Sequence, residues 1–321
     1  MRLTPLTPKG NLLILLINGY GDCFLALPAL REIRRRFTSC KIYMACFPDQ
    51  ANSLFQDLDF HFVAATGSNG QIRTEADLAE LDFQQIVSFN AYFPCSVECE
   101  LMERYEKLPR WGFCDMFGTP VDTVIGLSNS HMRDQYFHVL GWEPKYSERD
   151  RRVFLSAKTV DAFEDVLKEW SSTCGERVYS LHLDSLPEKM WPVEKWLELV
   201  DYIWLRWGAW PILLGEEDDQ ALTLVQRFSF ARRLPTQAGI ALHFATVKLT
   251  SAFIGIDSIF AHVSDSYGKP SVILFGPSDP VVWGPVSQLS RLVTTKKDKL
   301  LSELSLVEVE QEVDSLFCSV F

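Results

Sequence analysis

Residues 11–37 read NLLILLINGYGDCFLALPALREIRRRF, and this stretch decides the fold class. Its apolar run Leu12–Ile17 is short, continuous and ended by Asn-Gly, which is typical of a strand buried on both faces of a parallel sheet. After the glycine turn, apolar residues recur at helical spacing up to Phe37. This pattern predicts a helix that starts shortly before Pro28 or is kinked there, because proline lacks an N–H.

The same alternation continues along the chain of 321 residues, which is long enough for two domains. Further strands are predicted at 41–47, 85–90, 178–183, 210–214, 252–256 and 271–275. A helix is predicted between Pro192 and Gly208, which supply the usual start and stop signals. Strands that alternate with helices form parallel sheets with right-handed crossovers, so the sequence predicts two open α/β halves.

The domain boundaries follow from composition. We expect one Rossmann-like domain over 1–155 and a second over 176–299, since 146–176 is rich in charged residues, Ser and Thr and resembles a connection. The pattern of apolar residues in 300–321 predicts an amphipathic helix, which we expect to pack back toward the N-terminal domain.

Composition excludes several classes of protein. The net charge of −11 argues against non-specific nucleic-acid binding, which needs a basic surface. The 8 cysteines form no CxxC pair and no Cys/His cluster, so we expect buried, reduced thiols, no bound metal and a cytoplasmic location. The run Leu12–Ile17 is too short for a membrane span, so at most a peripheral membrane contact is expected.

The glycine turn after the first strand is the first candidate site. Gly19-Tyr20-Gly21 resembles the start of a dinucleotide-binding GxGxxG motif, but Phe24 replaces the third glycine and Asp22 follows directly. A carboxylate there opposes a pyrophosphate on the helix N-terminus, which disfavours an NAD-dependent dehydrogenase. Asp22 is either a helix N-cap or a general base at the carboxyl edge of the sheet.

A second candidate site is GIDSIFAHVSDSYGKPSVILFGPSDPVVWGP, residues 255–285. Asp257 and Ser258 open a helix there, and the N–H groups and the Ser258 hydroxyl can bind an anion beyond the sheet edge. The plainer alternative is ordinary capping, which is compatible with anion binding. His262, in the first turns of this helix, is on propensity more often a structural histidine than a ligand.

Single charged residues beside other strand ends have two interpretations each. Lys189 lies between a strand and the Pro192 helix, where it can neutralise a diphosphate or simply be solvated. Glu217, after another strand, can accept hydrogen bonds from ribose or merely start a helix. Four arginines late in the first helix predict mainly a solvated face: Arg31, Arg34, Arg35 and Arg36.

Together these segments resemble glycosyltransferase family 9, the heptosyltransferase-like enzymes. The resemblance rests on GYGDCFLALPALREIRRRF near the start, KMWPVEKW in the middle and FIGIDSIFAHVSDSYGKPSVILFGPSDPVVWGP near the end. It implies a GT-B fold, in which two Rossmann-like domains with parallel sheets face each other across a cleft. It also implies that the N-terminal domain binds the acceptor and the C-terminal domain the nucleotide sugar, without a metal or other cofactor.

The resemblance assigns roles to residues of this sequence. Asp22 resembles the catalytic base of an inverting, metal-independent transfer, and Glu217 the acid that contacts the donor's ribose. Diphosphate-binding positions are Ser185, Lys189, Asp257, Ser258 and His262, and acceptor-binding positions are Asn18, Gly19, Tyr20 and Gly21. The implied partners are a nucleotide-sugar donor, ADP-heptose by family precedent, and a glycan, lipid-linked or small-molecule acceptor.

Two positions depart from the family pattern. Ile259 stands where a glycine usually follows the Asp-Ser/Thr pair, and Asp184 stands where Thr or Ser is common. A larger side chain and an extra acid both weaken a diphosphate site. The alternative function is therefore a catalytically silent protein that binds a nucleotide sugar or a partner on the same scaffold.

Overall fold

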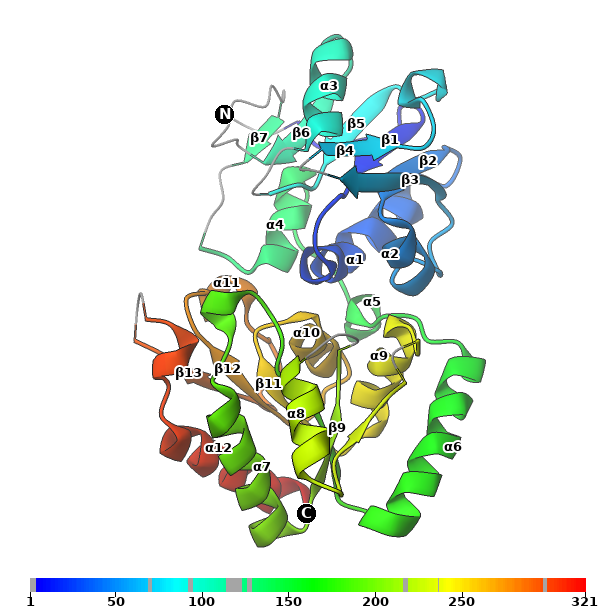
Figure 1. Ribbon diagram of the computed structural model, residues 1–321. Helices are drawn as coiled ribbons and strands as arrows, with labels where there is room; N and C mark the ends of the chain where they lie inside the picture. Colours follow the sequence, from blue (N-terminus) through cyan, green and yellow to red (C-terminus); the bar gives the residue numbers. More distant parts are fainter. Residues whose placement is uncertain are drawn as a thin grey trace. The chain divides into compact units, whose positions relative to one another are not determined.

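The computed structural model describes residues 4–68, 71–91, 95–113, 123–125, 129–215, 219–235, 237–296 and 299–321. The chain forms two compact units, Met1–Phe154 and Leu155–Phe321. Each unit is an open sheet covered by helices (Figure 1). The predicted α/β class with two Rossmann-like halves is confirmed.

The sheet of unit 1 has the order β4-β3-β2-β1-β5-β6-β7 in the described residues. Its strands are β1 (Leu12–Leu15), β2 (Ile42–Cys46), β3 (His61–Ser68), β4 (Gln71–Thr74), β5 (Gln85–Ser88), β6 (Arg110–Phe113) and β7 (Thr123–Ile125). All neighbouring strands are parallel except β3 and β4, which form an antiparallel hairpin at one edge. The β1 strand is buried on both faces, as its continuous apolar run predicts.

The helices of unit 1 are α1 (Tyr20–Arg36), α2 (Pro48–Ser53), α3 (Ser96–Arg104), α4 (Met132–Val139) and α5 (Glu148–Arg151), with a short 3-10 turn η1 (Leu78–Glu80). Helix α1 begins at Tyr20 and Pro28 lies inside it, so the first of the two alternatives, a start shortly before Pro28, is wrong. The Asn-Gly turn leads directly into helix α1, and the buried residues Cys23–Leu30 of this helix cover the sheet. Tertiary packing outweighs the backbone hydrogen bond that Pro28 cannot make.

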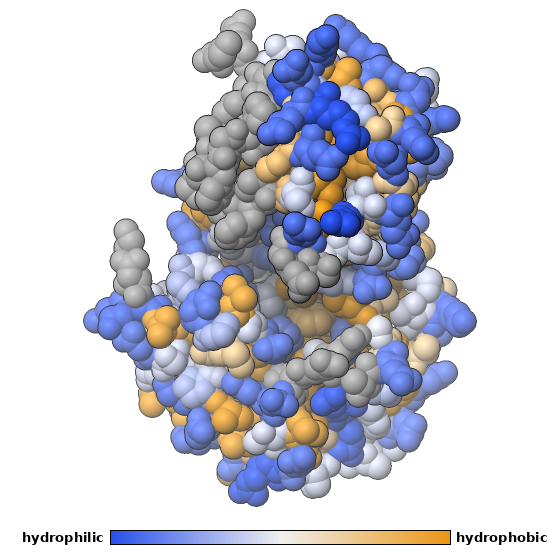
Figure 2. Space-filling model, turned by 45° about the horizontal axis from the view of Figure 1, so that its top comes forward, coloured by the Kyte–Doolittle hydropathy of each residue, from blue (hydrophilic) through white to orange (hydrophobic). Residues whose placement is uncertain are grey.

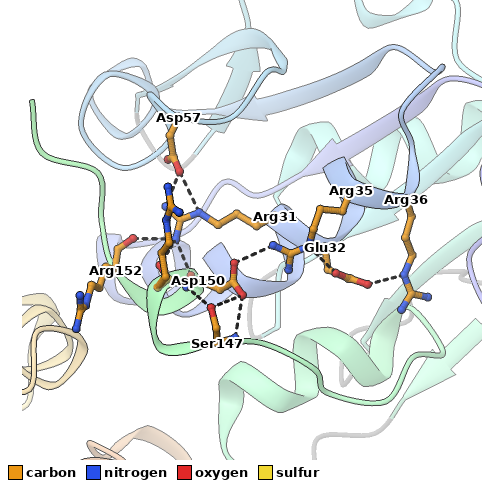
Figure 3. A network of polar contacts seen from close by, with 9 residues as sticks. Arg31, Glu32, Arg35, Arg36, Asp57, Ser147, Asp150 and Arg152 are labelled. Carbon is orange, nitrogen blue, oxygen red and sulfur yellow. Dashed lines mark hydrogen bonds and ion pairs between the residues drawn. The ribbon is translucent and has the colours of Figure 1, made fainter.

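The arginines on α1 are not a merely solvated face (Figure 3). Arg31 is bound to the carboxylate of Asp57 at 2.7 Å, and its Nη1 donates to the carbonyl oxygens of Asp150 and Arg152 at 2.6 and 2.8 Å. Arg35 donates to the carboxylate of Asp150 at 2.8 Å. These contacts fix helix α5 onto α1, just before unit 1 ends.

The sheet of unit 2 has the order β10-β9-β8-β11-β12-β13 and all its neighbouring strands pair in parallel. Its strands are β8 (Val178–His182), β9 (Trp210–Leu213), β10 (Arg232–Arg233), β11 (Ala252–Ile256), β12 (Ser271–Phe275) and β13 (Ser290–Thr294). Its helices are α6 (Ala157–Cys174), α7 (Val193–Trp207), α8 (Asp219–Arg227), α9 (Ile240–Leu249), α10 (Ile259–Ser266), α11 (Pro280–Trp283) and α12 (Leu306–Val320), with 3-10 turns η2 (Pro187–Lys189) and η3 (Leu301–Glu303).

The pleat of β8 divides its side chains between two cores. Tyr179 and Leu181 belong to a cluster with α7 and α12, whereas Val178 belongs to another that includes Phe163 of α6. Successive strand residues face opposite sides of a sheet, so both faces of this one are covered. In helix α7 the predicted start after Pro192 and the left-handed Gly208 stop are confirmed.

Two segments add to the predicted domain organisation. The expected connection at 146–176 contains the boundary between the units, after Phe154, and also the 18-residue helix α6, which belongs to unit 2 and buries Phe163. The C-terminal helix α12 forms as predicted and packs on α7, β12 and β13 of its own unit. The buried residues Val309, Val313 and Phe317 of α12 pack against apolar side chains of unit 2.

Two properties of the described residues bear on partners. None of the helices there combines the length and apolarity needed to cross a membrane. The described cysteines are all free, but Cys99 and Cys318 are exposed, so the expectation of uniformly buried thiols is wrong.

Candidate functional site

The candidate donor site lies at the carboxyl edge of the unit 2 sheet. Strand order reverses between β8 and β11, which lie side by side although they are far apart in sequence. Ligands of open α/β sheets bind outside the carboxyl ends of the strands at such a reversal point. The turn η2 with Lys189 follows β8 there, and Asp257 and Ser258 follow β11.

Lys189 and Asp257 form an ion pair at this point. The Lys189 Nζ lies 2.7 Å from Asp257 Oδ2, and the two side chains are 25% and 7% exposed. A nearly buried carboxylate needs such a partner, since an unpaired charge is costly inside a protein. The pair fixes the ammonium group beside the start of α10.

Ser258 occupies the N-cap position of α10 in an extended conformation, but its side chain makes no capping bond. The Ser258 Oγ is buried and has no hydrogen-bond partner among the described residues. The alternative of an ordinary Ser258 cap is therefore wrong. A buried hydroxyl without a partner at a positively polarised helix start can bind a ligand oxygen.

The other expected donor residues have varied positions. His262 is 5% exposed and lies in α10. Ser185 is half-buried in the loop before η2, whereas Asp184 is exposed. Glu217 lies outside the described residues. Within those residues no cluster of three or more His, Cys, Asp or Glu side chains could hold a metal ion.

Sequence reasoning missed two histidines beside this site. His182 ends β8 with its ring centre 4.6 Å from that of Phe260 in α10, and His243 of α9 lies 6.0 Å from the same ring. Burial lowers the pKa of His182 to about 3 and that of His243 to about 4, so both are neutral at pH 7. The available signal was a histidine at the end of a predicted strand next to the reversal point.

Unit 1 has its own reversal point, between β1 and β5. Beyond the paired residues of these strands, asparagine side chains form hydrogen bonds with the backbone. Asn90 Oδ1 accepts from the Ile17 N–H at 3.0 Å, and Asn18 Nδ2 donates to the Phe89 carbonyl at 3.3 Å. The Asn18 carbonyl also accepts from Gln50 Nε2 at 2.6 Å. Asn18, expected to bind the acceptor, thus anchors the loop before α1.

Asp22 lies in the first turn of α1 and is half-buried. The N-cap of this helix is Gly19, so the alternative that Asp22 is the N-cap is wrong. The Tyr136 hydroxyl, missed by the sequence reasoning, donates to Asp22 Oδ1 at 3.5 Å. Tyr136 is fully buried against Phe89 and Phe113, so its hydroxyl has a fixed place.

A cavity of about 730 Å³ lies next to this loop, a size typical of ligand sites. Its lining includes Asn18, Gly19 and Tyr20, with Phe47 and further residues of α2 and α3, but neither Gly21 nor Asp22. Figure 2 shows apolar residues in a narrow band between hydrophilic ones on the surface of unit 1. Three of the four expected acceptor residues therefore line one cavity.

Comparison with known proteins finds a similarity to one family within unit 2. Residues 178–310 match the model of glycosyltransferase family 9 (heptosyltransferase). Lipopolysaccharide heptosyltransferase 1 of Escherichia coli O18:K1:H7 is 27% identical over 194 residues, which are 57% of this chain and 53% of that protein. The chain thus spans about half the length of this relative.

Two solved structures resemble the whole chain in fold. The family 9 glycosyl transferase of Veillonella parvula has a TM-score of 0.75 at 17% identity, covering 99% of this chain and 100% of that one. The E. coli ADP-heptose lps heptosyltransferase II has a TM-score of 0.71 at 16% identity, covering 96% and 99%. Lys189, Asp257 and Ser258 lie inside residues 178–310, the part of the chain that is similar to glycosyltransferase family 9 (heptosyltransferase), and the whole chain shares its fold with these two structures.

Proposed function

We propose that the protein is an inverting, metal-independent glycosyltransferase that moves a heptose or related sugar from a nucleotide-diphosphate donor to an acceptor hydroxyl. The observation that carries this proposal is the Lys189–Asp257 pair beside the unpartnered Ser258 hydroxyl, at the reversal point of a sheet inside the family match. The reaction needs no further cofactor.

Unit 2 binds the donor diphosphate. Ser258 and the first N–H groups of α10 bind phosphate oxygens, and Lys189 turns from Asp257 toward the diphosphate. Ser185 and His262 complete this site, and Glu217 accepts from the ribose hydroxyls. ADP-heptose is the leading donor, since the name of the similar E. coli heptosyltransferase II contains it.

Unit 1 binds the acceptor and supplies the base. The cavity beside the loop combines the aromatic rings of Tyr20 and Phe47 with the polar side chains of Asn18, Asp49 and Gln50. Aromatic rings pack on the apolar faces of sugars, while amides and carboxylates bind their hydroxyls. This lining suits a glycan, free or lipid-linked, or a small hydroxylated molecule.

The chemical step is a single displacement at the anomeric carbon. Asp22 takes the proton of the acceptor hydroxyl, whose oxygen forms the new bond to carbon as the bond from carbon to the diphosphate oxygen breaks. The nucleoside diphosphate leaves with the bonding electrons, and the configuration inverts. Lys189 and the start of α10 stabilise the negative charge that grows on the leaving diphosphate.

The test is a transfer assay with ADP-, UDP-, GDP- and TDP-sugars, read by mass spectrometry of the acceptor and by release of the nucleoside diphosphate. We expect transfer from ADP-heptose, unaffected by EDTA. Asp22→Asn should lower kcat about 10²-fold or more while the donor Kd changes little, because only the base is lost. Normal turnover of this variant would remove Asp22 as the base.

One outcome distinguishes the proposed transferase from the alternative, a catalytically silent binding protein. A donor that stabilises the protein but is neither transferred nor hydrolysed indicates a silent binding protein on the same scaffold. A donor at 100 times its Kd raises the free energy of unfolding by about 2.7 kcal/mol, which a thermal shift detects. Transfer with inversion at the anomeric carbon excludes this alternative.

A further inference from the structure

A buried carboxylate that the proposed reaction does not use lies near residues 17–19, the loop between β1 and α1. Glu98, in the first turn of α3, is only 3% exposed. Its Oε1 accepts from the Ser88 hydroxyl at 2.5 Å, and its Oε2 accepts from Asn90 Nδ2 at 3.0 Å. These bonds and the positive end of α3 offset the cost of burying its charge.

Glu98 decides which way the Asn90 amide faces. Carboxylate oxygens accept hydrogen bonds, and the NH₂ group of Asn90 faces Glu98, donating to its Oε2 at 3.0 Å. The amide oxygen is then directed away from Glu98, where it accepts from the Ile17 N–H at 3.0 Å. Ile17 is 5% exposed and lies beyond the last paired residue of β1, so it depends on this side chain for its partner.

We propose that Glu98 is a positioning residue for the transfer reaction: through Asn90 it fixes the Ile17 backbone and thereby the loop that leads to Asp22. The loop continues through Asn18 to Gly19, the N-cap of α1, so a shift at Ile17 moves the helix start. This inference rests on the proposed role of Asp22. A misplacement of about 1 Å at a reacting group can cost about 10²-fold in rate.

A reciprocal exchange of amide and carboxylate tests this role. In Glu98→Gln, the side chain can present either an oxygen or an NH₂ group, and Asn90 loses its fixed orientation. In Asn90→Asp, two carboxylates face each other in a buried place. In the double variant Asn90→Asp/Glu98→Gln, the new amide donates to the new carboxylate, whose second oxygen still accepts from the Ile17 N–H.

We expect each single variant to lower kcat about tenfold or more per folded molecule, with the donor KM unchanged. The double variant should recover kcat to within about threefold of the wild type. Glu103→Gln, an exposed acid on the same helix, is the matched control and should leave kcat unchanged. A purely structural role would lower thermal stability in the single variants without changing kcat per folded molecule, and that result would overturn the proposal.

A second measurement does not depend on activity. Hydrogen exchange in peptides that span residues 12–20 should be at least about tenfold faster at Ile17 in Glu98→Gln and return to the wild-type rate in the double variant. If the protein transfers no sugar but the exchange follows this pattern, only the proposed function fails. If Glu98→Gln does not fold, the double variant alone tests the proposal. Slow exchange at Ile17 and a kcat near the wild-type value in the double variant support the role of Glu98, and fast exchange or a low kcat refutes it.

Discussion

The acid at position 22 shows how one residue's place in a helix selects its chemistry. Asp22 lies in the first turn of α1, where the positive end of the helix dipole favours an acidic side chain. The Tyr136 hydroxyl then restricts the direction of the carboxylate. A carboxylate whose direction is restricted suits the role proposed for Asp22, which is to take a proton from an acceptor hydroxyl.

Replacing Tyr136 by Phe removes only the hydroxyl. The ring should keep its edge contacts with Phe89 and Phe113, so the free energy of unfolding should change by less than about 1.5 kcal/mol. We expect kcat to fall about 3- to 10-fold, because Asp22, the proposed base, loses a hydrogen bond that orients it. Tyr105→Phe, on a ring that packs on Phe83, is the control for kinetics and urea melts. Equal kcat in both variants would contradict this role for Tyr136.

A double variant separates the observed ion pair of Lys189 with Asp257 from its proposed contact with the donor diphosphate. Lys189→Met leaves the carboxylate of Asp257 nearly buried and unpaired, which should cost about 1–2 kcal/mol of stability, reduced by the partial exposure of the lysine. Adding Asp257→Asn removes the charge and should restore most of that loss. Donor affinity should stay at least about tenfold weaker in both variants. Urea melts and donor titration check this, and recovered donor binding in the double variant would disprove a Lys189–diphosphate contact.

At the scale of elements, α5 depends on α1 for its existence. A helix of four residues is not stable alone, and Arg31 binds the carbonyl oxygens at its C-terminal end while Arg35 binds Asp150 (Figure 3). The capping box formed by Ser147 and Asp150 satisfies the other end. These contacts hold the chain where it leaves unit 1.

Arg31→Met should therefore release α5. We expect trypsin to cleave after Arg149, Arg151 or Arg152 about tenfold faster, because local opening becomes easier while the rest of unit 1 stays folded. Arg36→Met, on the same helix but bound to Glu32 and not to α5, is the control. Equal cleavage rates in the two variants would show that Arg31 does not hold this segment.

At the scale of the whole molecule, two buried neutral histidines link stability to pH. Burial lowers the pKa of His182 and His243 from 6.5 to about 3 and about 4, so below about pH 6.5 the unfolded chain binds protons that the folded chain does not. The folded state is thus favoured above that pH and loses stability as the pH falls, by about 2 kcal/mol per histidine between pH 7 and pH 5.

Replacing His243 by Phe should make Tm less dependent on pH over this range. The exposed His61, replaced by Gln, serves as the control and should leave the pH dependence of Tm as in the wild type. Thermal unfolding from pH 5 to pH 8 measures the effect. A wild-type slope in His243→Phe would show that this imidazole does not remain neutral in the folded chain.

The sequence by itself determined the α/β class, most strand positions and the glycine turn before Asp22. Those features depend on local patterns: continuous apolar runs, helical spacing, and Gly and Pro signals. It did not predict helix α6, because charged residues, Ser and Thr hid the buried Phe163 and its apolar neighbours in a helix that is mostly exposed. An apolar stripe predicted helix α12, but such a stripe does not say which surface covers it, and only the structure shows that α7, β12 and β13 do so.

Only the tertiary structure decided which distant residues meet. Lys189 pairs with Asp257, Tyr136 donates to Asp22, and Asn90 accepts from the Ile17 N–H, and the members of each pair are far apart in sequence. Strand order sets these meetings, since it brings β8 beside β11 and β1 beside β5, and a local pattern carries no information about strand order. The sequence therefore specified which chemical groups are available, and the sheets determined their partners.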